Sequence, residues 1–192
     1  MLELRGIVAR VPRHDLYDDA LYRKLCTAPQ EANVTKGRPS YTGMHKYMDK
    51  EGGYALWLPS DWREIPMVEG RHGVIFTPHP DRMDTSFVVE KRILPYKVTE
   101  KDLSVLRKGF IAGLESLPGV EIESQTEKMT RTLKIFEARY TFMEDDVRRK
   151  RWVRSVYWGE GHLLLIAQGA TEEEFAYYEG MFYNTMMTVE IS

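Results

Sequence analysis

The sequence predicts an α+β fold, in which an antiparallel β-sheet is flanked by helices and preceded by an N-terminal extension. Three observations support this prediction. From position 54 onward, stretches of alternating apolar and polar residues recur, as in half-buried antiparallel strands. Two other stretches, at 99–117 and from 171 onward, repeat their apolar residues every three or four positions, as helices do. Residues 1–53 differ in composition, because they contain many turn-forming residues and few apolar ones.

The bulk composition narrows the class of protein. A chain of 192 residues can bury a sizeable core, so one domain with an extension is expected. The net charge of −2 favours neither nucleic-acid binding nor disorder. The single cysteine, Cys26, cannot form an internal disulfide. The sequence shows neither the apolar run of a signal peptide nor a stretch long enough to span a membrane, so we expect a cytoplasmic protein.

Residues 1–53 are expected to form an N-terminal arm. A short strand is predicted before Pro12, and Asp15 to Cys26 has the spacing of a short helix. From Thr27 to Gly53 no apolar period remains. The arm has too few apolar residues to fold alone. It therefore packs on its own domain, or it reaches a partner or another subunit.

The domain is expected at 54–192 and opens with the stretch YALWLPSDW at 54–62. Alternate residues of this stretch are apolar, as in a strand with one buried face. Pro59 has no backbone N–H to donate, so the strand should end there. We expect Trp57 and Trp62 to be structural anchors rather than a pair that stacks on a ligand.

Two more strands and a helix are predicted next. The strands are expected at Gly73–Thr77 and Ser86–Leu94. A near capping box at Thr99 and Asp102 should begin a helix that Pro118-Gly119 ends. Its apolar stripe comprises Leu103, Leu106, Phe110, Leu114 and Leu117.

The second half is predicted to be a meander followed by a helix. Strands are expected at Val120–Met129, Leu133–Phe142, Arg151–Trp158 and His162–Gln168. Because Leu163 to Ala167 is apolar on both faces, the last strand should be central in the sheet. A capping box at Thr171–Glu174 should begin the final helix. Its predicted core residues are Phe175, Tyr178, Met181, Phe182 and Thr185.

This order of elements, together with YALWLPSDW, resembles the PsbP-like fold. The superfamily includes the extrinsic PsbP subunit of photosystem II, a nuclear Ran-binding import factor and bacterial chaperones for secretion effectors. The likeness spans residues 54–192, and the Gly-Val-Glu at 119–121 and the acid-rich start of the last helix also fit it. The resemblance implies an α/β/α sandwich that is used mainly for binding and not for catalysis. It offers no counterpart for the 53-residue arm.

No metal, cofactor or catalytic site is predicted. The five histidines include no pair at the i, i+4 spacing that places two imidazoles on one metal. The cluster His79, Asp81 and Asp84 would suit a hard cation or acid/base chemistry only if the side chains converged in a pocket. We favour a solvated turn whose aspartates cap backbone N–H groups.

A nucleophilic enzyme is also disfavoured. An activated Ser or Cys needs a positioned base, and Cys26 and His14 share a loose segment. Ser60 and Ser86 lack the flanking glycines of a nucleophile elbow, and nucleotide-binding glycine loops are absent from the sequence. We therefore expect a protein that is not an enzyme.

Two features are candidates for partner binding. The densest basic run comprises Arg148, Arg149, Lys150 and Arg151. It suits an acidic partner or phosphate groups, but three preceding acids favour a solvated, locally neutralised hairpin tip. Tyr177 and Tyr183 fall outside the apolar stripe of the last helix, so they form either a second contact face or a surface that the arm covers.

We therefore expect a non-enzymatic protein-binding or assembly module. It would dock on a larger complex, or self-associate, through its N-terminal arm. The expected partner is a protein or another copy of the chain, with no nucleic acid and no membrane span. The alternative is a carrier or chaperone that binds a small apolar ligand or a hydrophobic segment between sheet and helix.

Overall fold

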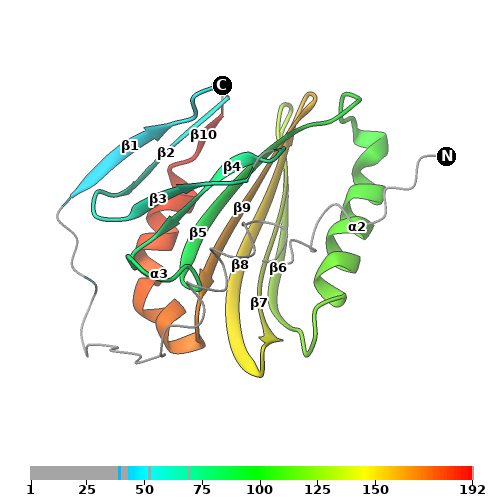
Figure 1. The fold of residues 1–192 in the computed structure, drawn as a ribbon. Helices are drawn as coiled ribbons and strands as arrows, with labels where there is room; N and C mark the ends of the chain where they lie inside the picture. The colour runs from blue at the N-terminus through cyan, green and yellow to red at the C-terminus, as the bar shows by residue number, and fades with distance from the viewer. Residues whose placement is uncertain (1–38, 40–42, 52, 69, 192) are drawn as a thin grey trace.

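The computed structural model describes residues 39, 43–51, 53–68 and 70–191. In this part of the chain, a seven-stranded antiparallel sheet separates helix α2 (Leu103–Glu115) from helix α3 (Glu172–Met187) (Figure 1). The predicted α+β sandwich is therefore confirmed. The strand predicted before Pro12 and the helix predicted at Asp15 to Cys26 lie outside the described residues.

The large sheet has the strand order β3-β4-β5-β9-β8-β7-β6. Its last four strands in sequence form the predicted meander, with β9 between β5 and β8 as its apolar pattern indicated. β3 is a short strand that the sequence did not predict. The strands are β3 (Arg63–Pro66), β4 (His72–Thr77), β5 (Ser86–Ile93), β6 (Glu121–Met129), β7 (Lys134–Glu144), β8 (Val147–Trp158) and β9 (Gly161–Gly169).

A second, three-stranded sheet has the order β1-β2-β10. Its strands are β1 (Met44–Met48), β2 (Tyr54–Pro59) and β10 (Glu190–Ile191). β1 lies between Thr27 and Gly53, where no apolar period was found, so the sequence pattern did not predict this strand. The Tyr47 ring of β1 lies edge-on to Phe76, with centroids 5.1 Å apart. The predicted arm thus supplies one strand and one core aromatic to the domain.

The two tryptophans of the opening stretch have different environments. Trp62 is buried and lies edge-on to Phe182 and Tyr178, with centroids 5.8 and 6.1 Å apart. It is the predicted anchor. Trp57 is 40% exposed on β2, so the same prediction is wrong for Trp57. Leu56 and Leu58, on the other face of β2, are fully buried and join the core.

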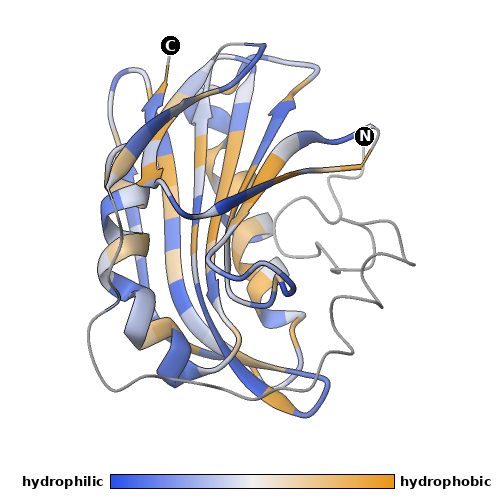
Figure 2. Cartoon of the chain, turned by 60° about the vertical axis from the view of Figure 1, so that its left-hand side comes forward, coloured by the Kyte–Doolittle hydropathy of each residue, from blue (hydrophilic) through white to orange (hydrophobic). Residues whose placement is uncertain are grey.

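The large sheet has an apolar core on each face. Successive strand residues point to opposite faces, and alternate apolar and polar bands are visible along the strands in Figure 2. Trp152 and Leu165 pack in the cluster that includes α3 residues. Val153 and Leu164 pack in the cluster that includes α2 residues. The sheet is therefore covered on both faces, which explains why β9 is apolar throughout.

Both predicted helices begin at their predicted caps. Thr99 donates its backbone N–H and its hydroxyl to the Asp102 carboxylate, both at 2.8 Å, and these bonds lower the pKa of Asp102. A 3-10 turn at Glu100–Asp102 then leads into α2 (Leu103–Glu115). The hydroxyl of Thr171 accepts from the Glu174 N–H at the start of α3 (Glu172–Met187). Neither described helix is long and apolar enough to cross a membrane.

Two glycines near α3 should respond to alanine in opposite directions. A Cβ on Gly169 would lie 2.4 Å from the backbone nitrogen of Phe175, so Gly169→Ala should lower the free energy of unfolding by about 1–3 kcal/mol. A Cβ on Gly180, inside α3, would meet no atom within 4 Å. Gly180→Ala should raise the free energy of unfolding by about 0.5–1 kcal/mol through helix propensity. Urea unfolding of both variants tests this prediction, and equal effects would contradict it.

Candidate functional site

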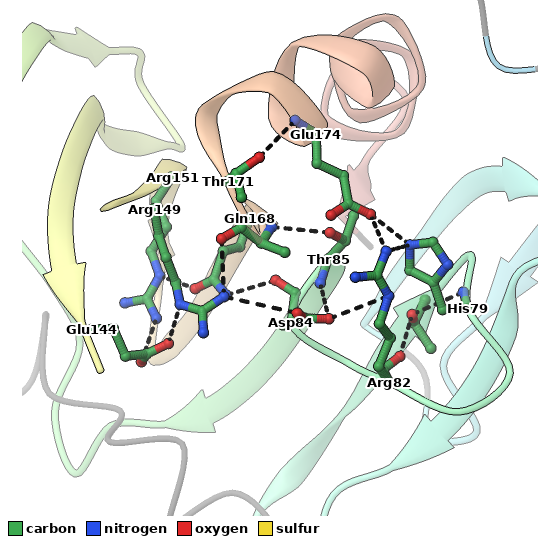
Figure 3. A network of polar contacts seen from close by, with 12 residues as sticks. His79, Arg82, Asp84, Thr85, Glu144, Arg149, Arg151, Gln168, Thr171 and Glu174 are labelled. Atoms are coloured by element: carbon green, nitrogen blue, oxygen red, sulfur yellow. Dashed lines mark hydrogen bonds and ion pairs between the residues drawn. The ribbon is translucent and has the colours of Figure 1, made fainter. Parts of the chain in front are cut away.

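A buried polar network joins the loop between β4 and β5 to the start of α3 (Figure 3). The Glu174 side chain projects from the first turn of α3 and is almost fully buried. Its Oε1 lies 2.7 Å from Nε2 of His79 and 2.7 Å from Nη2 of Arg82. Because the Thr171 cap holds the backbone of Glu174, the helix start fixes the carboxylate that binds the loop.

The network continues from the loop into the sheet through Asp84. Its carboxylate lies 3.8 Å from Nε of Arg82 and 3.9 Å from Nη1 of Arg149 on β8. Gln168 on β9 donates to the Asp84 carbonyl at 2.8 Å. Nε of Arg149 lies 2.7 Å from Glu144 on β7. The loop between β4 and β5 is therefore tied to strands β7, β8 and β9 at one end of the sheet.

This geometry shows where the side chains of the predicted cluster His79, Asp81 and Asp84 lie. Asp84 is buried, so the solvated-turn interpretation is wrong for it, although it does accept from the N–H of Thr85 at 3.2 Å. Asp81 is exposed, while His79 and Asp84 belong to different branches of the network. Within the described ranges, three metal-ligating side chains do not converge anywhere. Because Glu174 and Asp84 each face an arginine, the arrangement is suited to holding the loop against the helix.

The basic run lies in strand β8 and not in a hairpin tip. The tip is formed by Asp145 and Asp146, whose φ angles of 52° and 61° fit a two-residue hairpin turn. The prediction that the basic run forms the hairpin tip is therefore wrong. The predicted local neutralisation is confirmed for Glu144, whose carboxylate lies 2.7 Å from Nε of Arg149 and 3.8 Å from Nη2 of Arg151.

Strand alternation divides the four basic residues between the two faces of the sheet. Arg149 and Arg151 are 5% and 7% exposed, and both lie near Glu144. Lys150, on the α3 face, pairs with Glu123 at 2.8 Å. Arg148 pairs with two glutamates, Glu121 and Glu172. The four residues are thus brought together in one strand but not in one basic surface.

The two predicted tyrosines, in contrast, lie together in a groove of about 620 Å³ along the outer face of α3. Tyr183 is 50% exposed, and its ring stacks on Trp152 of the sheet with centroids 6.1 Å apart. Tyr177 is half-buried. Pro39, from the predicted arm, lines the same groove. The other described lining residues are Ala176, Glu179, Gly180, Met181 and Asn184.

A smaller hollow of about 200 Å³ lies between α2 and strands β6 and β7. Phe110 and Phe136 form apolar walls, and the paired Arg107 and Glu127 line it as well. Ligand pockets usually measure about 300–1,000 Å³. This hollow is therefore smaller than a typical ligand pocket, so it gives no support to the carrier function that was left open as the alternative.

The structure also contains a buried serine–histidine pair that was not predicted from the sequence. Ser155 of β8 and His162 of β9 are fully buried, with Oγ 2.7 Å from Nε2, and the His162 ring stacks on Tyr157 at 4.3 Å. Burial, and then the nearby Arg92, lowers the pKa of His162 to about 3. Substrate cannot reach a hydroxyl with no exposed surface, so the pair is structural. The only available signal was strand alternation, which places both side chains on the α2 face.

No family model and no curated protein sequence matches this chain. Solved structures do resemble it. The match to the cyanobacterial PsbP (CyanoP) of Synechocystis sp. PCC 6803 covers 82% of this chain and 99% of the CyanoP chain, with 15% sequence identity and a TM-score of 0.57. The match to LpqN of Mycobacterium tuberculosis, a protein involved in cell envelope biogenesis, covers 78% of this chain and 91% of the LpqN chain, with 13% sequence identity and a TM-score of 0.55. The chain therefore has the PsbP-like fold that the resemblance predicted, and at these identities the likeness shows the fold alone.

Proposed function

We propose that this protein is a non-enzymatic protein-binding module that docks on its partner through the groove along the outer face of α3. The observation that carries the proposal is the location of Tyr177 and Tyr183 in one groove of about 620 Å³. Aromatic side chains with a polar tip are enriched at protein interfaces, and tyrosines are frequent hot spots.

The groove combines a buried floor with walls that are held by ring stacking and an ion pair. Met181 is buried, so its place in the floor is fixed by the core. Tyr183 rests on Trp152, which Arg139 covers at 4.3 Å from the ring centroid. Arg139 also pairs with Glu179 in the groove wall at 2.6 Å. A partner segment would therefore meet a preorganised aromatic surface, which lowers the entropic penalty of binding.

The arm is the second part of the proposal. Pro39 belongs to the predicted arm, and it lines the groove. The arm residues before Pro39 are therefore covalently joined to a residue of the proposed docking surface. A tethered segment acts at a high effective concentration, so the arm is placed to assist or to compete with a partner.

Gly180 provides the sharpest test because it lines the groove with open space above its Cα. Gly180→Arg should fill the groove without harming the fold, since arginine has a higher helix propensity than glycine. We expect the variant to lose the partners that wild type and Gly180→Ala both capture. The measurement is affinity capture with quantitative mass spectrometry, followed by binding of the purified partner. Equal capture by the arginine and alanine variants would refute the docking surface.

A further inference from the structure

Strand β6 ends the large sheet with an unusually long edge. It pairs with β7 only, and all nine of its residues, Glu121–Met129, are exposed. At the opposite end of the sheet, β3 has four residues and ends at a proline. In an antiparallel strand, about half of the residues turn both backbone groups away from the paired neighbour. Among the described strands, β6 therefore presents the longest row of outward N–H and C=O groups.

The acidic side chains of β6 do not guard this edge. Natural edge strands often avoid pairing by means of charged side chains. Here Glu127 is held by Arg107 of α2, with two contacts of 2.6 Å. Glu121 pairs with Arg148 and Glu123 with Lys150. The three carboxylates are therefore neutralised over the faces of the sheet and leave the backbone edge accessible.

The β6 residues are also complementary to themselves in one antiparallel register. We consider two copies related by a two-fold axis perpendicular to the sheet, which keeps each face of the sheet on the same side. Residues opposite one another in antiparallel strands have their side chains on the same face, so the axis must lie between one residue and its own copy. With the axis at Thr126, Thr126 meets its own copy, Gln125 meets Glu127, and Ser124 meets Lys128. Axes at Glu127 or Lys128 would each place a charged residue opposite its own copy. Because Glu123 is the extra residue of a bulge, an axis at Gln125 would set Ile122 against the carboxylate of Glu127, although it would also pair Glu121 with Lys128. The Thr126 register has a long overlap in which neither like charges nor an apolar side chain and a carboxylate lie opposite one another.

The apolar residues of the strand fit the same register. A bulge between Ile122 and Ser124 makes Glu123 the extra residue, so Ile122 comes opposite Met129 of the second copy. These two side chains are each 38% exposed and are the large apolar residues of β6. Each pair occurs twice because of the symmetry. The contact would thus cover two apolar pairs and two Ser124–Lys128 pairs.

We propose that β6 is a self-association site at which two copies of the chain join their sheets, antiparallel and centred on Thr126. The second copy continues the sheet through backbone hydrogen bonds from β6 to β6. The hollow under α2 opens at this edge, since Gln125 and Glu127 line it. A backbone ladder with little apolar area gives a weak and reversible dimer. This site is separate from the α3 groove, so either proposal can fail alone.

Charge variants at Ser124 test the register with the full chain. Ser124→Lys places lysine opposite Lys128 twice, whereas Ser124→Glu places glutamate opposite Lys128 twice. We expect the lysine variant to weaken dimerisation roughly 2- to 30-fold and the glutamate variant to strengthen it by a similar factor. Adding Lys128→Glu to the lysine variant should restore the dimer. Sedimentation equilibrium over a concentration series into the millimolar range measures each dissociation constant.

Residue 124 is exposed, so its substitution leaves the core intact. Because Ser124 lies opposite Arg139 of β7, the lysine variant should unfold at a slightly lower midpoint than the glutamate variant, and circular dichroism of the monomeric forms measures this difference separately from dimerisation. A wild-type chain that stays monomeric throughout the series would overturn the proposal. A dimer that responds equally to lysine and glutamate would also overturn it, because such a dimer does not pair through this register. Gly180→Arg should leave the dimer unchanged.

Discussion

Replacing Glu174 with alanine is expected to lower the free energy of unfolding by about 3 kcal/mol. Its buried carboxylate contacts both His79 and Arg82 at 2.7 Å. Removing it leaves the Arg82 guanidinium in a largely buried site, where Asp84, at 3.8 Å, is a second acidic neighbour. Losing one member of a buried ion pair costs about 3–5 kcal/mol, and the second acid places the expected value at the low end.

Two further variants separate the charge from the side-chain volume. Glu174→Gln keeps an acceptor oxygen in the same place, so it should lose about half as much stability as the alanine variant. Glu173→Ala, on the exposed side of the same helical turn, should change stability far less. Urea unfolding at neutral pH measures all three. If the Glu173 and Glu174 alanine variants proved equally stable, the network would not anchor the loop to α3.

Local patterns predicted most elements of the fold because the residues that define them are close in sequence. The hydroxyl at Thr171 and the apolar period that follows identify α3, and Leu163 to Ala167 identify a central strand. β1 was not predicted because it has only five residues, and only two of them are as much as half-buried. Its strand character comes from pairing with β2, which a local pattern cannot express.

The candidate site was predicted only in part, for a related reason. Tyr177 and Tyr183 were identified because a helix fixes which residues fall off its buried stripe. The burial of Arg149 and Arg151 could not be predicted, since it depends on Glu144 lying across the β7–β8 hairpin. Four basic residues in a row suggest one surface, but a strand divides them between two faces. Predicting that division required the strand boundary, which was placed four residues too late.

His162 should make the protein sensitive to mild acid. Its pKa is lowered to about 3 in the folded protein, chiefly by burial, while an unfolded histidine has a pKa near 6.5. Above about pH 6.5 the residue is neutral in both states and adds no pH dependence. Below that value the unfolded state binds a proton that the folded state does not. The free energy of unfolding should therefore fall by up to about 1.4 kcal/mol per pH unit until the pH approaches 3.

His162→Asn removes the titrating ring and keeps a group that can pair with Ser155. This variant should be less stable than wild type at neutral pH, because it loses the stacking on Tyr157, yet its stability should fall less steeply between pH 6.5 and 5. That window lies above the range in which ordinary carboxylates titrate, so the difference in slope reports the histidine. His45→Asn, at an exposed position of β1, is the matched control and should keep the wild-type slope. Parallel slopes for wild type and His162→Asn in urea unfolding would show that the buried ring is protonated in the folded protein as readily as in the unfolded chain.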